Sequence, residues 1–292
     1  MKTKASQKAS EMLYVSQPTV SNHISNLEKE LDTVLFIRTK RNVTLTKSGN
    51  ILYEHAKNII LAYRTMTSEL KSYNQNTEGH LNIYASSVPR KFLLPKLLKD
   101  FSAKYPNVSY SLVNDDSQTV LDGLMIGETD FGFVGIKVDS PKLSYHQLME
   151  DELVLVASEE LSVRHDKDMN ISLDDIVKYP IIMREEGSGT RSILENELNR
   201  LGIDVSELNL FAVIEDPSTI LQMVECGLGC SVISKFEADS IVENNKIKKY
   251  KLKDLNLKRH FYFVYNTDMQ YVPINKIFKS FILNMMKNSI LA

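Results

Sequence analysis

Small hydroxyl residues and glycines gather at two strand-to-helix turns in the C-terminal two-thirds of the chain. Ser86 and Ser87 follow an alternating apolar strand, and residues 187–190 read Gly-Ser-Gly-Thr before a helical segment. The first turn of a helix offers free N–H groups and a positive dipole end, and small side chains let an anion approach them. These turns predict an anion site with the candidates Ser86, Ser87, Ser188, Gly189 and Thr190. The same residues also suit plain turns with capped helices, so both interpretations stay open.

Short polar side chains also gather at a helix start near the N-terminus. Ser16 stands at an N-cap position with Pro18 in the first turn, where the missing N–H of proline is harmless. An apolar stripe follows at spacings of 4, 3 and 4, formed by Val20, Ile24, Leu27 and Leu31. Off that stripe lie polar side chains short enough to approach another surface closely, namely Gln17, Thr19, Ser21, Asn22 and Ser25.

The segment from Phe36 to Leu45 looks like two short strands around a basic tip. With the preceding helices it predicts a helix-turn-helix followed by a wing. Charge agrees, because residues 1–75 hold 11 Lys/Arg against 6 Asp/Glu, whereas residues 76–292 hold 24 against 31. A basic segment joined to an acidic body suggests a polyanionic partner for the first part only.

A long helix is predicted from Asn50 to about Tyr73, where Pro and Gly are absent. Apolar residues recur there at alternating spacings of 4 and 3, which is a heptad seam. We interpret it as a dimerising linker, although a core-facing helix would show the same periodicity. The seam consists of Leu52, Ala56, Ile59, Tyr63, Met66, Leu70 and Tyr73.

After Gly79 the pattern changes to alternating strands and helices in two successive series of about 100 residues each. Such a repeat predicts two α/β lobes with a ligand cleft between them. The predicted division is a winged helix-turn-helix over 1–49, a linker helix and hinge over 50–78, lobe 1 over 79–157 plus 267–292, and lobe 2 over 158–266.

Composition narrows the function. No run of eighteen apolar residues and no export signal occur, so we expect a cytoplasmic protein without membrane contact. Two cysteines, Cys226 and Cys230, cannot build a disulfide framework. Ser188 lacks a nucleophile-elbow context because Glu186 occupies the first glycine's place, and no nucleotide-phosphate loop is present. The six histidines lack metal-ligand spacing. We expect no enzyme activity, no cofactor and no metal.

The segment LYVSQPTVSNHISNLEKEL at residues 13–31 closely resembles the helix-turn-helix of LysR-type transcriptional regulators, and so does its continuation LFIRTKRNVTLTKSG at residues 35–49. The resemblance covers the whole chain. It implies an N-terminal all-α winged helix-turn-helix with a linker helix, plus a two-lobed α/β periplasmic-binding-protein-like effector module. It further implies a homodimer or homotetramer on double-stranded promoter DNA.

Residue by residue, the resemblance implies major-groove contacts for Gln17, Pro18 and Ser21. It implies phosphate contacts for Ser16, Thr19, Ser25, Arg38, Arg41 and Thr46. These types suit the roles, since a Gln amide can pair with adenine and cationic wing residues neutralise phosphates. For Ser16 and Thr46, helix capping is the simpler alternative.

The string REEGSGTR at residues 184–191 resembles the branch of the family that controls sulfur metabolism. That resemblance implies a small oxyanion effector such as sulfite or sulfate, with an organic carboxylate as the alternative. One departure stands out. Family members begin with a further apolar helix before the position of Ser6, where this sequence has only five residues. Our hypothesis is a start site further upstream, and the alternative is a solute-binding module without competent DNA binding.

Overall fold

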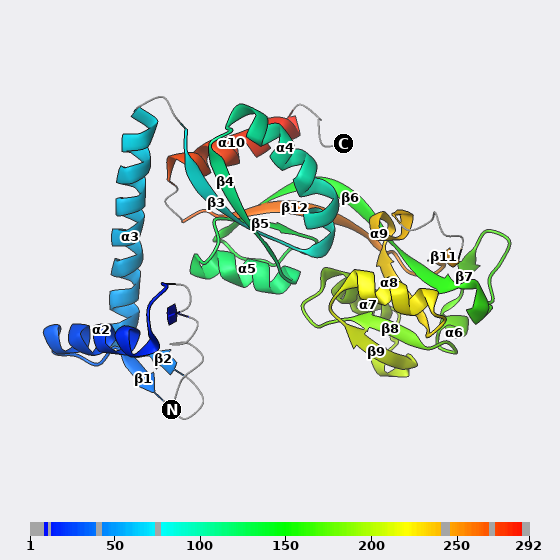
Figure 1. The fold of residues 1–292 in the computed structure, drawn as a ribbon. Coiled ribbons are helices and arrows are strands. Elements are labelled where there is room, and N and C mark those ends of the chain that lie inside the picture. Colours follow the sequence, from blue (N-terminus) through cyan, green and yellow to red (C-terminus); the bar gives the residue numbers. More distant parts are fainter. Residues whose placement is uncertain are drawn as a thin grey trace. The chain divides into compact units, whose positions relative to one another are not determined.

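We describe the protein from a computed structural model that covers residues 9–10, 13–38, 43–73, 77–240, 246–268 and 272–287 (Figure 1). The chain divides into two compact units, Met1–Glu69 and Leu70–Ala292. None of the described helices is both long enough and apolar enough to cross a membrane.

The first unit contains the predicted helix and wing. Helix α2 spans Gln17–Glu30, and the Oγ atom of its N-cap residue Ser16 accepts the N–H of Thr19 at 3.3 Å. Strands β1 (Phe36–Arg38) and β2 (Val43–Leu45) pair antiparallel, with Phe36 opposite Leu45. The predicted recognition helix and two wing strands are therefore confirmed. The apolar stripe of α2 is only half-buried in this chain, and Leu31 is 44% exposed.

A single carboxylate joins the end of α2 to the start of the wing. Glu28 Oε1 accepts the backbone N–H of Leu35 at 2.8 Å and that of Phe36 at 3.3 Å. Leu35 itself is only 1% exposed. The two hydrogen bonds satisfy backbone donors at the start of β1, so Glu28 fixes the angle at which the chain leaves α2.

Helix α3 (Lys47–Tyr73) follows the wing and begins three residues before the predicted linker start at position 50. Its start is capped, because the hydroxyl of Thr46 donates to the carbonyl of Val34 at 2.7 Å and accepts the N–H of Gly49 at 2.9 Å. A Cβ on Gly49 would collide with the carbonyl of Leu35. Close backbone packing thus fixes the wing against α3.

The second unit is built on a ten-stranded sheet within the described residues, in the order β4-β3-β5-β12-β6-β10-β8-β9, with β11 pairing β6 and β7. Two lobes share it, and β6 and β12 run between them (Figure 1). The elements of lobe 1 are β3 (Gly79–Ala85), the π-helical turn η1 (Pro89–Leu93), α4 (Leu94–Lys104), β4 (Val108–Asn114), α5 (Ser117–Ile126), β5 (Phe131–Val134), the first part of β6 (Leu143–Ser158), β12 (Lys258–Asn266) and α10 (Pro273–Lys287).

Lobe 2 takes the rest of β6 and the elements that follow it. These are η2 (Glu159–Leu161), β7 (Asn170–Ile171), α6 (Leu173–Ile176), β8 (Ile181–Arg184), α7 (Gly189–Arg200), η3 (Val205–Glu207), β9 (Leu210–Ile214), α8 (Pro217–Glu225), β10 (Cys230–Ser234), α9 (Lys235–Asp239) and β11 (Ile247–Leu252).

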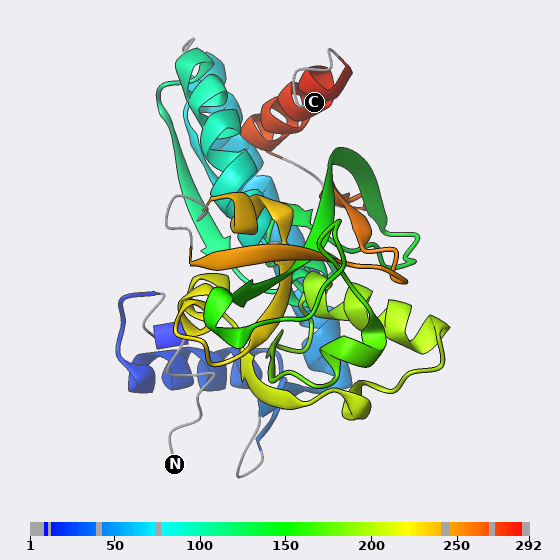
Figure 2. The same ribbon diagram turned by 90° about the vertical axis from the view of Figure 1, so that its right-hand side faces the viewer.

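Each lobe buries both faces of its part of the sheet. In lobe 1, α4 and α10 lie side by side on one face (Figures 1 and 2), where Phe101 and Phe278 meet edge to face with ring centroids 5.0 Å apart. Helix α5 covers the opposite face through Val120 and Leu124. In lobe 2, α7 packs on one face in a cluster with Leu194, and α8 on the other in a cluster with neighbouring strand residues. Parallel strands covered on both faces are the arrangement that the strand–helix alternation predicted.

The lobe boundaries differ from those predicted at 157/158 and 266/267. Residues 153–157 pair with β10 and include core residues of lobe 2, whereas β12 pairs with β5 and contributes Phe263 to the core of lobe 1. Periodicity in the sequence predicts where helices and strands lie. Only the strand pairing in the structure shows to which lobe each part of a shared strand belongs.

Candidate functional site

A small cavity lies between the two lobes and is lined by residues from both. Its volume is about 20 Å³, room for about one water molecule. Lobe 1 contributes the residues after β3 and the start of α5, and lobe 2 contributes the end of β8, the start of α7 and the first part of the shared strand β12. The lining residues are Ser86, Ser87, Val88, Asp116, Ser117, Arg184, Ser188, Gly189, Thr190, Arg259 and Phe261.

The lobe 1 wall is formed by two helix starts. Ser86 follows β3, and both its N–H and its hydroxyl donate to the carbonyl of Phe133, at 2.9 and 3.3 Å. Ser87 opens the helical segment that continues as η1. Ser117, 2% exposed, is the first residue of α5, and Asp116 caps that helix by accepting the N–H of Thr119 at 3.0 Å.

The lobe 2 wall is the start of α7. Ser188 occupies the N-cap position, and within the described chain its side chain makes no capping hydrogen bond. Ser188 and Thr190 are 3% and 5% exposed. A capping hydroxyl ordinarily accepts a backbone N–H. The first turn of α7 thus keeps its donors without a side-chain cap, at the positive end of the helix dipole.

The two walls touch at glycines. A Cβ on Gly189 would come within 3.4 Å of Ser117 Oγ and 3.0 Å of the side chain of Ile136 in lobe 1. Gly187 has a positive φ of 86°, and a Cβ there would collide with the carboxylate of Asp116. The absence of side chains at these two positions allows the lobes to meet around the cavity.

A buried ion pair forms the floor of the cavity. Arg259 Nε donates to Asp151 Oδ2 at 2.8 Å, and Arg259 Nη1 donates to the hydroxyl of Thr190 at 3.1 Å. The guanidinium lies over the ring of Phe261, 4.6 Å from its centroid. Asp151 also accepts the hydroxyl of Ser234 at 2.9 Å. Burial lowers the pKa of the Arg259 guanidinium from its ordinary value, and the charge of Asp151 opposes that shift.

A second arginine lies at the end of β8. Arg184 donates to Glu185 through Nε and Nη2, both at 2.7 Å, which is a bidentate pair. Nearby, Glu237 on α9 is 3% exposed, and burial raises its pKa above the ordinary value while the charges of Arg184 and Arg259 oppose the rise. The cavity is therefore surrounded by charged groups that largely compensate one another.

The structure brings all five predicted anion-site residues to one cavity. The sequence interpretation missed Ser117, Arg184, Arg259 and Asp151. A signal existed for two of them. Arg259 lies two and four positions before the buried Phe261 and Phe263, so an alternating strand places it on their face. Asp151 lies two positions before the buried Leu153 in the same way. A charged residue in register with a buried face indicates a buried ion pair.

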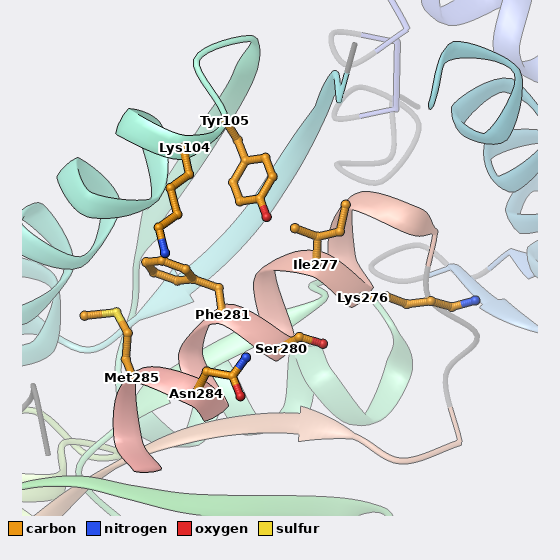
Figure 3. A pocket seen from close by; sticks show the side chains of 8 residues that line it. All are labelled: Lys104, Tyr105, Lys276, Ile277, Ser280, Phe281, Asn284 and Met285. Carbon is orange, nitrogen blue, oxygen red and sulfur yellow. The ribbon is translucent and has the colours of Figure 1, made fainter. Parts of the chain in front are cut away.

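A wider groove lies on the outside of lobe 1, between the end of α4 and α10 (Figure 3). Its volume is about 400 Å³, and Tyr105, Ile277 and Phe281 form much of its lining, with Lys104 lying 5.3 Å from the ring centroid of Phe281. None of the residues predicted from the sequence lines it. Among the described residues, no group of three or more His, Cys, Asp or Glu is arranged to hold a metal ion.

Six of the nine predicted DNA-contacting residues lie on α2 or at its N-cap. Ser16 and Pro18 are exposed, and Gln17, Thr19, Ser21 and Ser25 are partly exposed. The hydroxyl of Thr46 is engaged in the cap of α3, as described above. For Arg38 the structure describes only the strand position, and Arg41 falls outside the described residues.

The predicted dimer seam runs along α3. Ile59 is 70% exposed, Tyr63 64% and Met66 49%. Leu52 and Ala56 are half-buried, and the side chains of Leu70 and Tyr73 fall outside the description. An exposed apolar row along a helix is typical of a surface that packs against another helix.

Comparisons with known proteins agree with this architecture. Residues 74–287 match the LysR substrate binding domain, and residues 1–50 match the bacterial regulatory helix-turn-helix protein, lysR family. An uncharacterised HTH-type transcriptional regulator from Methanocaldococcus jannaschii is 34% identical over 263 residues, covering 90% of this chain and 88% of that protein. The HTH-type transcriptional regulator CysL of Bacillus subtilis is 28% identical over 271 residues, covering 93% and 89%.

A solved structure shows the same fold over almost the whole chain. Full-length CbnR complexed with its target DNA matches with a TM-score of 0.62 at 21% identity, covering 96% of this chain and 93% of that one. The winged helix-turn-helix, the linker helix and the two-lobed module thus recur together in one polypeptide.

Proposed function

The chain belongs to the LysR family of transcriptional regulators, which are not enzymes, and from this premise we propose that it binds promoter DNA and senses a small oxyanion between its two lobes. One observation carries the effector part of the proposal. Hydroxyl residues, three helix starts and a buried guanidinium surround a cavity of about 20 Å³.

The wall chemistry suits an oxyanion such as sulfite or sulfate. Ser86, Ser87, Ser188 and Thr190 supply hydroxyls, and the start of α7 supplies backbone N–H groups and a favourable dipole. Burial strengthens each of these interactions, because the local dielectric is lower than that of water. A ligand of several atoms needs a small opening of the lobes, so binding is coupled to their closure.

An organic carboxylate is the competing effector, since it could use the same donors. Size favours the inorganic anion, because a cavity of about 20 Å³ has to open less for it than for a ligand that carries a hydrocarbon body. The name of the Bacillus subtilis relative gives no ligand, so the decision rests on a direct test.

For DNA, we propose that α2 enters the major groove. Gln17 and Ser21 lie four residues apart and therefore about 40° apart around the helix, on one side. Both are partly exposed. Gln17 can read a base edge. Ser16 and Thr19, at the start of α2, and Ser25, about two turns further along the helix, can hold phosphates. Thr46 acts by fixing the junction of wing and α3, because its hydroxyl proton is already donated to Val34.

We further propose that two chains pair through α3, so that two recognition helices meet two half-sites of a roughly palindromic operator. Ile59, Tyr63 and Met66 form the described centre of this seam. The anion acts as a switch only if it binds the closed and open arrangements of the lobes with different affinities.

Thermal-shift titration of the full chain tests the effector proposal. Sulfite, sulfate and thiosulfate are compared with acetate, benzoate and shikimate at constant ionic strength. We expect a concentration-dependent stabilisation by at least one oxyanion, since a ligand that binds only the folded state raises its stability. A carboxylate response without any oxyanion response would reject the oxyanion proposal and favour the organic effector.

A further inference from the structure

Arg259 is a cation of the cavity whose guanidinium has one nitrogen left to donate. Its Nε and Nη1 atoms donate to Asp151 and Thr190, whereas Nη2 makes no hydrogen bond within the described parts of the chain. In the same described parts Arg184 also keeps one nitrogen, Nη1, without a hydrogen bond, but Glu185 binds its other two nitrogens in a bidentate pair, whereas only one nitrogen of Arg259 is bound to a carboxylate. Arg259 is therefore the guanidinium better placed to receive an incoming anion.

Asp151 is held opposite Arg259 by the sheet itself. The two residues are register partners across β12 and β6, and their side chains are 5% and 0% exposed. Asp151 keeps one oxygen on Arg259 Nε and the other on the hydroxyl of Ser234. The carboxylate is thus a fixed negative charge next to the cavity.

Two anions cannot both have the full benefit of one buried guanidinium. Opposite charges at this separation attract strongly in a low-dielectric interior, and like charges repel to a similar degree. An oxyanion that contacts Arg259 meets a charge already neutralised by Asp151 and is repelled by the same carboxylate. Its affinity must then be lower than the hydroxyls, the helix start and Arg259 alone would provide.

On the basis of the proposed oxyanion function, we propose that Asp151 is an internal anion that competes with the effector for Arg259. The carboxylate lowers the affinity of the cavity for oxyanions and so sets the effector concentration at which the regulator responds. Arg259 is then an effector-binding residue, and Asp151 is a positioning residue that determines the response threshold.

The test compares Asp151→Asn with the wild type by calorimetric titration of sodium sulfate into the full chain at constant ionic strength. The amide keeps an oxygen for Arg259 Nε but removes the charge, so we expect sulfate to bind at least roughly tenfold more tightly. The matched control is Glu150→Gln. Glu150 is one residue away on the same strand and forms an exposed pair with Lys258 at 3.6 Å. The Glu150→Gln substitution removes the same charge as Asp151→Asn and should leave the affinity for sulfate unchanged.

A double variant separates competition from simple repulsion. In an Arg259→Gln background, the gain from Asp151→Asn should shrink severalfold, because the guanidinium that it liberates is absent. An equal gain in both backgrounds would overturn the proposal, since Asp151 would then act on the anion only through space.

If Asp151→Asn does not fold, Arg259→Lys is the alternative variant, because it keeps a positive charge beside Asp151. A point charge replaces the planar fork, so sulfate affinity should fall at least roughly tenfold while the unfolding temperature changes little. Unchanged affinity in this variant overturns the proposal.

The outcomes also separate this proposal from the proposed function. A wild type that binds sulfate, with an Asp151→Asn variant that binds no more tightly, overturns only the role of Asp151. Binding by the variant alone supports the role of Asp151 and places sulfate outside the effectors of the wild type. Binding by neither protein overturns both.

Discussion

Gly187 of lobe 2 lies directly against Asp116 of lobe 1, so closely that a Cβ on the glycine would collide with the carboxylate. Asp116 cannot easily move away, because it caps α5 through the N–H groups of Gln118 and Thr119. The contact therefore couples the turn that begins α7 to the helix start on the other wall of the cavity. Closure of the two lobes therefore depends on Gly187 having no side chain.

Gly187→Ala should weaken closure and with it anion binding. Alanine at this positive φ costs about 1 kcal/mol in backbone strain alone, and the collision with Asp116 adds to it. The control is Gly202→Ala, which has a similar φ of 76° but open space where the Cβ would lie. We expect roughly tenfold weaker anion binding for Gly187→Ala than for Gly202→Ala in calorimetric titration. Equal affinities would show that the contact does not control closure.

Glu28→Ala should destabilise the DNA-binding unit. Removing the carboxylate leaves the N–H groups of Leu35 and Phe36 without their acceptor, a loss of about 1–3 kcal/mol. Glu30→Ala, on the exposed side of the same helix, changes the charge equally and should cost less than about 0.5 kcal/mol. Scanning calorimetry of the full chain measures both, and similar destabilisation by the two variants would refute the structural role of Glu28.

A charge placed in the exposed seam of α3 should separate the chains. Ile59→Asp would bury a carboxylate against the partner helix, which is strongly unfavourable. Ile51→Asp is the matched control, because Ile51 is also exposed, at 58%, but lies off the seam. Light scattering after gel filtration should show a lower mass for Ile59→Asp only. An unchanged mass for both variants would remove α3 as the dimer interface.

Glu237→Gln should change how stability depends on pH. Burial raises the pKa of Glu237 above its ordinary value of 4.5, so above that pH the unfolded chain ionises this group while the folded chain keeps it protonated. The associated stability is complete below pH 4.5 and is lost as the pH rises through the folded pKa. The Glu237→Gln variant does not lose this part of its stability as the pH rises.

Chemical denaturation at several pH values above 4.5 tests this. The variant should gain stability relative to the wild type by at most about 1.4 kcal/mol per pH unit until the folded pKa is reached. Parallel pH profiles for the two proteins would mean that Glu237 is charged in the folded state.

Local patterns in the sequence were sufficient for the helix starts. Ser16 with Pro18 predicted the start of α2, and the Gly-Ser-Gly-Thr turn predicted a helix after residue 190, whereas α7 begins at Gly189. Each depends on residues adjacent along the chain, where capping and turn preferences act. The hydroxyl half of the candidate site was therefore predictable.

The charged half was not, because it arises from pairing between distant strands. Arg259 and Asp151 are 108 positions apart and become neighbours only when β12 pairs with β6. Strand β6 was not predicted, since its second half is buried on both faces and loses the alternation that marks a strand. No local sequence pattern predicts which distant strand will pair with a given strand.

The most direct test of the account follows DNA binding and anion response in one titration. Fluorescence anisotropy measures binding of the full chain to the intergenic DNA beside its own gene, at low salt, with and without sulfite or sulfate. Gln17→Ala with Ser21→Ala should weaken binding by roughly 10- to 100-fold, as expected for lost base contacts, whereas Asn26→Ala, on the opposite side of α2, should not.

The anion should change the DNA affinity or the bound complex of the wild type, and Ser188→Ala with Thr190→Val should abolish that change. The account would be contradicted if the anion did not change DNA binding by the wild type. It would also be contradicted if the folded full-length chain did not bind this DNA at low salt.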